Sequence, residues 1–316
     1  MKAPKLRKLT DCIAFAAKAF NKLHLIQLSM FLFKCKDKIV LDYLYKHYND
    51  FIENYTPQKI LVKKRFEISP IWICWLQGED KAPLLVQKCL ASIRSHANGH
   101  PVVLISEKNI GDYVDIPDQI LAGLDYGILS RTSFSDIIRS ALLASYGGMW
   151  IDATFFITRD LPESYFKYSL FSAAKQPEPR KRRNVCISKS RWTTSFIGAK
   201  DAGHLLFCFV RDFFFEFMKI HTEFIDYLLF DYIIYLAYKH FPNVKNDIAA
   251  IPNNNIDFGW LFHAMNKPFA LEKAKDMFHG STFAYKLSWK KNWKKNLCGR
   301  KTFYGAFLDG DFDNVF

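Results

Sequence analysis

The chain lacks long apolar runs and paired cysteines, and each absence excludes a class of protein. No stretch approaches the roughly 18–20 uncharged apolar residues that a membrane-spanning helix needs. The seven cysteines are scattered, without a Cys-x-x-Cys pair, which argues against structural zinc and favours reduced thiols. The basic N-terminus is no convincing signal peptide, because Asp11 and Lys18 interrupt its apolar part. We therefore expect a cytoplasmic location.

Internal repeats, low-complexity segments and nucleic-acid-binding motifs are also missing. Half of the 316 residues are apolar and 16% are aromatic, enough for one large core. The apolar patterns predict a helical N-terminal segment over residues 1–66 and an α/β domain over residues 67–316. The absence of a nucleic-acid motif argues against such a partner.

Positive charge is plentiful but unevenly spread. Residues 1–66 hold 14 Lys and Arg against 5 Asp and Glu, and so carry +9 of the net charge of +13. Residues 286–301 add seven basic residues and no acid, and residues 180–191 add six. This asymmetry indicates a polyanionic partner or an anionic membrane surface. A basic nucleic-acid- or polyanion-binding protein without catalysis is therefore the alternative class of function.

Residues 133–157 carry the most informative pattern. Residues 133–146 predict an amphipathic helix, and Gly147-Gly148 ends it. An apolar strand follows and holds one carboxylate, Asp152, which is costly there unless it is paired or coordinated. Asp136 and Arg139 lie three residues apart, so they share one face of the helix and can reach a common ligand.

This pattern, Ser-Asp-Ile-x-Arg followed by Gly-Gly-x-Trp-x-Asp, resembles the core of family 32 glycosyltransferases and the related capsular polysaccharide synthesis proteins. The resemblance implies a GT-A-like α/β fold with a Rossmann-type sheet. It also implies that Asp136 and Arg139 hold the donor sugar and that Asp152 is the first Asp of a D-x-D-like motif. In that motif the carboxylates contact ribose, diphosphate and a divalent metal, Mn²⁺ or Mg²⁺. Here Thr154 replaces the second Asp, and a neutral hydroxyl is a weaker ligand for a hard cation.

The resemblance extends upstream to a strand over residues 71–78. It implies that Trp75 stacks on the base of the nucleotide, with Trp72 as the second choice. A helix over residues 83–96 and a buried strand over residues 102–105 complete a predicted βαβ unit. Because open sheets bind ligands beyond the carboxyl ends of their strands, we expect Trp75 and Asp152 at one rim.

Two further segments resemble parts of such enzymes. His279 and Lys286 match a C-terminal His … Lys-x-x-Trp segment, which implies that His279 binds metal and Lys286 contacts the diphosphate. A structural histidine is the alternative for His279. Residues 202–218 and 221–240 predict two helices, on which Asp226 and Asp231 either face the acceptor or solvate the helix.

Two segments suit a membrane surface. The first predicted helix of the N-terminal segment has lysines beside its apolar face, so it either anchors at an interface or packs on the catalytic domain. Trp289 and Trp293 alternate with lysine pairs, which suits a membrane boundary, a diphosphate clamp or a solvated loop.

The resemblance implies a retaining hexosyltransferase. Its donor is expected to be a nucleotide sugar, most simply a UDP-sugar. Its acceptor is expected to be a cell-surface or capsular glycan, or a lipid-linked oligosaccharide. The protein would then be cytoplasmic and peripheral at the inner face of the plasma membrane.

Overall fold

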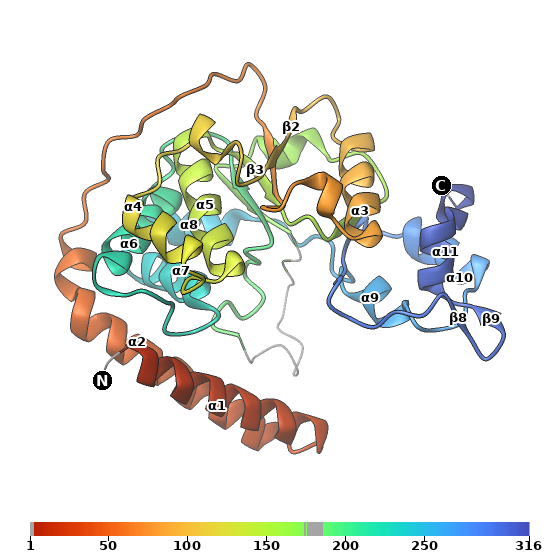
Figure 1. Ribbon diagram of the computed structural model, residues 1–316, viewed down its shortest axis with the longest axis horizontal. Coiled ribbons are helices and arrows are strands. Elements are labelled where there is room, and N and C mark those ends of the chain that lie inside the picture. The colour runs from red at the N-terminus through yellow and green to blue at the C-terminus, as the bar shows by residue number, and fades with distance from the viewer. Residues whose placement is uncertain (1–2, 174, 176–185, 316) are drawn as a thin grey trace.

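A computed structural model describes residues 3–173, 175 and 186–315. Its centre is a mixed five-stranded sheet with the strand order β2-β1-β3-β6-β5 (Figure 1). Its strands are β1 (Ile71–Cys74), β2 (Val102–Ile105), β3 (Gly148–Ile151), β5 (Leu170–Ser172) and β6 (Phe196–Ala199). The predicted α/β fold with a GT-A-like, Rossmann-type sheet is confirmed.

The first half of the sheet is parallel. Strand β1 pairs with β2 and β3 in parallel, and α3 (Leu84–Ser95) connects β1 to β2, as the predicted βαβ unit requires. Strands β6 and β5 then add in antiparallel orientation. The carboxyl ends of β1 and β3 therefore meet at one edge, where Trp75 and Asp152 follow them directly.

The predicted continuous strand through Asp152 is wrong. Strand β3 ends at Ile151, and residues 152–154 form a turn that is closed by a hydrogen bond from the amide of Phe155 to the carbonyl of Asp152. The chain then continues as β4 (Phe155–Ile157), which leaves the central sheet and pairs with β7 (Ala284–Lys286). The turn places the carboxylate at the edge of the sheet. Inside a buried strand the same carboxylate would have had neither water nor a ligand to contact.

Helices cover both faces of the sheet (Figure 1). One face packs on α4 (Asp118–Asp125), α5 (Arg131–Tyr146), α6 (Leu205–Ile220), α7 (Leu229–His240) and α8 (Pro242–Ala250). The other packs on α3, α9 (Trp260–Ala264), α10 (Leu271–Phe278) and α11 (Phe303–Asp309). A small ribbon of β8 (Asn296–Leu297) and β9 (Arg300–Lys301) precedes α11.

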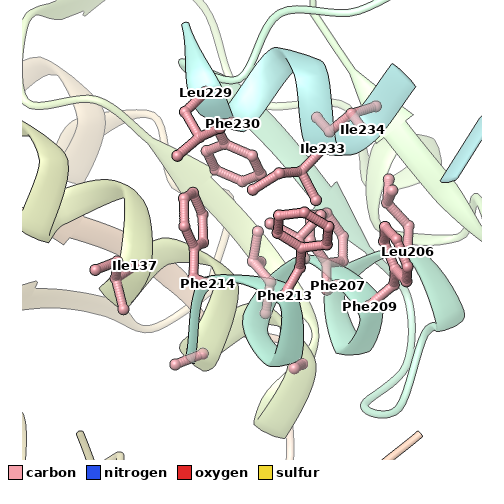
Figure 2. Packing of buried hydrophobic residues seen from close by; sticks show 14 of the residues in the cluster. Ile137, Leu206, Phe207, Phe209, Phe213, Phe214, Leu229, Phe230, Ile233 and Ile234 are labelled. Carbon is pink, nitrogen blue, oxygen red and sulfur yellow. The ribbon is translucent and has the colours of Figure 1, made fainter. Parts of the chain in front are cut away.

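The core between α5, α6 and α7 is rich in phenylalanine. Figure 2 shows Phe213 and Phe214 of α6 facing Phe230 and Ile233 of α7. Phe214 and Phe230 meet edge to face with ring centroids 5.6 Å apart, a favoured aromatic geometry. This packing fixes α5, which carries Asp136 and Arg139, against the sheet.

The N-terminal residues form two antiparallel helices, α1 (Ala3–Lys22) and α2 (Ile26–Glu53). Leu6 and Val40 are fully buried and belong to the same core as Trp72 of β1. The helices therefore pack on the domain, while the predicted boundary at residue 66 stays a prediction. None of the helices in the described part of the chain is long and apolar enough to cross a membrane.

Candidate active site

A pocket of about 390 Å³ opens at the carboxyl ends of β1 and β3. Its walls come from five segments that are distant in sequence: residues 74–77 at the end of β1, the first half of α5, residues 150–154, Tyr227, and residues 286–290. Of the predicted site residues, Trp75, Arg139, Asp152, Thr154 and Lys286 line it. Asp136 does not line the pocket but forms an ion pair with Arg139, which does.

Asp152 is the centre of the polar contacts. One carboxylate oxygen accepts hydrogen bonds from Trp150 Nε1 at 2.8 Å and Arg139 Nη2 at 3.2 Å. The other accepts one from Lys286 Nζ at 2.5 Å. Burial opposes ionisation, but the positive charges of Lys286 and Arg139 outweigh it and lower the pKa of Asp152 below its usual value. The group is therefore an anion at neutral pH.

Arg139 links α5 to the floor of the pocket. The same Nη2 atom lies 3.2 Å from Asp136 and from Asp152, and the guanidinium carbon lies 4.8 Å from the centre of the Trp150 ring. Arg139 is only 5% exposed. Its Nε atom is buried and has no hydrogen-bond partner among the described residues, so a donor is left over for a ligand.

Asp136 is held differently from Asp152. Burial raises its pKa from 3.8 to about 7, and the nearby negative charge of Asp152 adds to the effect of burial while Arg139 opposes it. Two carboxyl groups that share one arginine are thus pushed apart in pKa, one ionised and one near its midpoint at neutral pH. Asp136 does not itself line the pocket, so its contact with a donor sugar stays a prediction.

Lys286 reaches the site from the far end of the sequence. In the β4–β7 ribbon Lys286 pairs with Phe155, three residues after Asp152. The backbone amide of Lys286 donates to the carbonyl of Phe258, which fixes the end of β7. The turn at residues 152–154 brings β4 beside β7, the strand that carries Lys286. Sequence periodicity does not show this pairing.

The rim of the pocket is aromatic. Trp75 meets Trp289 edge to face, with ring centroids 5.7 Å apart, and its Nε1 atom is buried without a partner among the described residues. Trp72 instead lies in the core and donates to the carbonyl of Gly147, so it does not reach the pocket. Trp293 packs on Phe262 and donates to a backbone carbonyl. The two tryptophans of the 286–301 segment thus contact protein.

Tyr227 is a pocket residue that sequence reasoning missed. It lies between α6 and α7, in a segment predicted as helix that in fact forms a loop over residues 221–228. The ring is largely exposed. Partial desolvation in the pocket wall, with the negative charges of Asp136 and Asp152, nevertheless raises the pKa of Tyr227. The available signal was its position directly after Asp226, in a segment already predicted to approach the acceptor.

Asp226 and Asp231 have structural partners. Asp226 forms a buried ion pair with Lys36 of α2 at 2.8 Å and also accepts the backbone amide of Leu228. Asp231 accepts a hydrogen bond from Trp192 Nε1 at 2.9 Å. Neither lines the pocket, so the prediction that they face an acceptor is not supported. The basic run at 180–183 lies outside the described residues.

The predicted metal ligands do not come together. His279 follows α10, bonds to the carbonyl of Val315 at 3.0 Å and does not line the pocket. Both oxygens of Asp152 already contact cationic groups. No group of three or more His, Cys, Asp or Glu side chains within the described residues is placed to hold a metal. The described residues therefore offer no preformed metal cluster, and the expected divalent cation stays a prediction.

Comparison with known proteins supports the resemblance found in the sequence. No curated protein matches the chain. A family model for capsular polysaccharide synthesis proteins matches residues 21–307, which include every residue of the pocket described above. Since this match spans most of its length, the chain belongs to the capsular polysaccharide synthesis protein family.

Proposed function

We propose that the protein is a glycosyltransferase that moves a sugar from a nucleoside diphosphate donor to a glycan acceptor. The family supports a glycosyltransferase-like role in capsule synthesis. The finer assignments, a UDP-sugar donor, a cell-surface or lipid-linked acceptor and retention of anomeric configuration, are part of the proposal.

The observation that carries it is the set of groups around Asp152. Arg139 and Lys286 hold two positive charges at the floor of a pocket whose rim is formed by Trp75 and Trp289. A base stacked on an aromatic face gains about 1–3 kcal/mol, and a diphosphate requires cationic contacts. The two orphaned donors, Arg139 Nε and Trp75 Nε1, both belong to this pocket and suit a ligand rich in acceptor atoms.

In this proposal, positively charged side chains neutralise the negative charge that develops on the leaving diphosphate. Lys286 can turn from Asp152 to a phosphate oxygen, because a lysine ammonium is a compact charge on a flexible stem. Arg139 keeps Asp152 paired when that happens. Placing fixed positive charge where negative charge develops lowers the barrier to departure of the leaving group. Asp136 and Arg139 orient the sugar.

The experiment is a panel of nucleotide sugars with release of nucleoside diphosphate as the readout. We expect turnover with one donor and its abolition in Asp136→Ala and Arg139→Ala, with melting profiles that remain cooperative. Lys245→Ala, an exposed lysine on α8, serves as the control and should match wild type. Near-normal turnover in either pocket variant would refute the assignment of that residue. The anomeric proton of the product, seen by NMR, tests retention.

Polyanion binding without catalysis remains the competing function. It predicts salt-sensitive binding to RNA and no release of nucleoside diphosphate from any donor. The same panel, run beside an RNA-binding assay at low and high salt, separates the two.

A further inference from the structure

Large apolar side chains gather where α1 turns into α2. Between 41% and 76% of each is exposed, which is unusual for so many in one short segment. They are Phe15, Leu23, Leu25, Leu28 and Phe31. In Figure 1 the two helices form a hairpin whose turn lies apart from the rest of the chain. We call these five residues and the turn the hairpin tip.

The hairpin tip is compact along the helix axes. Phe15 precedes Leu23 by eight residues and Phe31 follows the turn closely. At a rise of about 1.5 Å per residue, the five side chains lie within about 12 Å of the turn. They therefore form one end of the molecule and can enter a single planar surface together.

The fold does not need these side chains. The contacts that hold the hairpin come from other residues: Leu6 and Ala17 are fully buried, Phe33 is nearly so, and the hydroxyl of Thr10 donates to the carbonyl of Ile225 at 2.9 Å. The exposed set thus has no structural role within the described chain. This also means that deleting the first helix would damage the core, whereas surface substitutions at the tip would not.

The charge around the tip has one sign. Residues 12–36 contain no Asp or Glu, and Lys18, Lys22 and Lys34 are exposed. Apolar side chains with flanking lysines are the composition of interfacial helices on anionic bilayers. A contact between two copies of the chain would instead bring like charges together, which disfavours that occupant.

We propose that the hairpin tip is a docking surface for an anionic lipid bilayer, with Phe15, Leu23 and Phe31 entering the headgroup region and the lysines pairing with lipid phosphates. The sequence predicted that the first helix either anchors at an interface or packs on the catalytic domain, and it did not locate an exposed surface at the turn between the two helices. In the Trp/Lys segment Trp293 packs on Phe262, and Trp289, although 43% exposed, contacts Trp75 at the rim of the pocket. The five side chains of the hairpin tip instead share one exposed end of the hairpin.

The hairpin that carries the tip also contacts the loop that forms one wall of the pocket. Thr10 contacts Ile225, two residues from Tyr227 on the pocket wall, and Leu23 lies 13 residues after Thr10, just past the end of α1. That separation is about 20 Å of helix. If the proposed function holds, on which this point alone rests, a bilayer at the tip would present a lipid-linked acceptor beside the pocket.

The test is co-sedimentation of the full chain with phosphatidylcholine vesicles that contain or lack phosphatidylglycerol, at low and high salt. We expect binding to the anionic vesicles that high salt weakens. Phe15→Glu/Phe31→Glu should lower the partition coefficient about tenfold or more. The matched control is Leu61→Glu/Tyr126→Glu, which changes side chains of similar exposure elsewhere and should bind like wild type. Lys18→Gln/Lys22→Gln/Lys34→Gln should reduce binding to anionic vesicles only.

The failure of this proposal is distinct from that of the proposed function. Phe15→Glu/Phe31→Glu should melt like wild type and bind UDP like wild type, because neither residue contacts the pocket. Equal sedimentation of this variant and wild type would overturn the proposal, as would equal binding to neutral and anionic vesicles. So would a wild-type dimer in light scattering that the variant dissociates, since a second copy would then occupy the tip.

Discussion

Asp152 stays charged in a place where burial alone would neutralise it. Three donors surround its two oxygens, and two of them carry full positive charge. The pairing with Asp152 holds Arg139 and Lys286 at the floor of the pocket before a substrate arrives, so Lys286 has only to turn from the carboxylate to a phosphate oxygen. Preorganised charge is what the departure of a diphosphate requires.

Lys286→Ala should weaken UDP binding about tenfold or more, because a hydrogen bond to a charged partner contributes about 1.5–3 kcal/mol. It also leaves the Asp152 carboxylate facing the phosphates with one cation fewer. Titration calorimetry measures the dissociation constant, with Lys245→Ala as the exposed-lysine control. Unchanged affinity for UDP would show that the lysine serves only to hold Asp152.

Asp136→Asn should stabilise the protein, and more so at alkaline pH. The pKa of Asp136 is about 7 in the folded protein against an ordinary value of 3.8, so the folded state binds its proton more tightly. Ionisation therefore costs stability as pH rises from about 4 through 7, and asparagine avoids that cost. The gain in melting temperature should be larger at about pH 8 than at about pH 5. A gain that is equal at both pH values would contradict the raised pKa; Asp42→Asn, fully at the surface, is the control.

At the scale of elements, the helix-turn-strand unit around Gly148 brings the site residues together. Gly148 has φ +79°, and a Cβ there would lie 2.3 Å from the carbonyl oxygen of Pro70. The amide of Met149 donates to the same carbonyl, so the turn and the start of β1 are locked at close range. Only glycine permits both the backbone conformation and this approach.

Gly148→Ala should therefore destabilise far more than Gly99→Ala. Gly99 has the same φ of +79° but open space where its Cβ would stand. The Gly99 variant should lose about 1–2 kcal/mol from left-handed strain alone. The Gly148 variant adds a backbone clash, so urea unfolding should show a clearly larger loss. Equal losses in the two variants would mean that the close approach to Pro70 carries no energy.

The loop at 221–228 depends on the N-terminal helices. Lys36 and Asp226 have side chains that are each 3% exposed, and their pair holds the loop that carries Tyr227. Removing one partner leaves a buried charge unpaired. Lys36→Met should therefore cost about 3–5 kcal/mol in free energy of unfolding.

The matched control for the Lys36 substitution is Lys38→Met, which removes an exposed ion pair with Asp42 and should cost no more than about 1 kcal/mol. In Lys36→Met/Asp226→Leu both charges are gone, so much of the loss should return. A double variant as unstable as Lys36→Met would show that packing, rather than the unpaired charge, causes the loss.

For the whole molecule, the sequence predicted the parts whose signals are local. Periodicity and glycines placed α5, β1, β2 and the Gly147-Gly148 turn, and a short ordered motif identified Arg139 and Asp152. What it missed depends on tertiary contacts. The departure of β4 to pair with β7 is visible only in three dimensions, and the loop at Tyr227 is held by an ion pair between Asp226 and Lys36, which lie 190 residues apart. His279 followed a resemblance in sequence, but its ring bonds to the chain's own C-terminal region.

The position of the basic residues on the surface also depends on tertiary contacts. The net charge of +9 in residues 1–66 does not by itself say which surface of the folded protein carries the lysines. In the folded chain, Lys36 is used internally, and Lys18, Lys22 and Lys34 surround the exposed hairpin tip. A composition can therefore indicate a class of partner, but which lysines face it depends on packing.

The most direct test of the central claim is titration calorimetry of the wild-type protein with UDP, UMP and uridine in the presence of a chelator. The account predicts that UDP binds most tightly, that UMP and uridine follow, and that chelation changes the UDP affinity by no more than about twofold, because Lys286 and Arg139 supply the positive charge. Absence of binding by UDP and by every other nucleoside diphosphate, with or without added Mn²⁺, would contradict it.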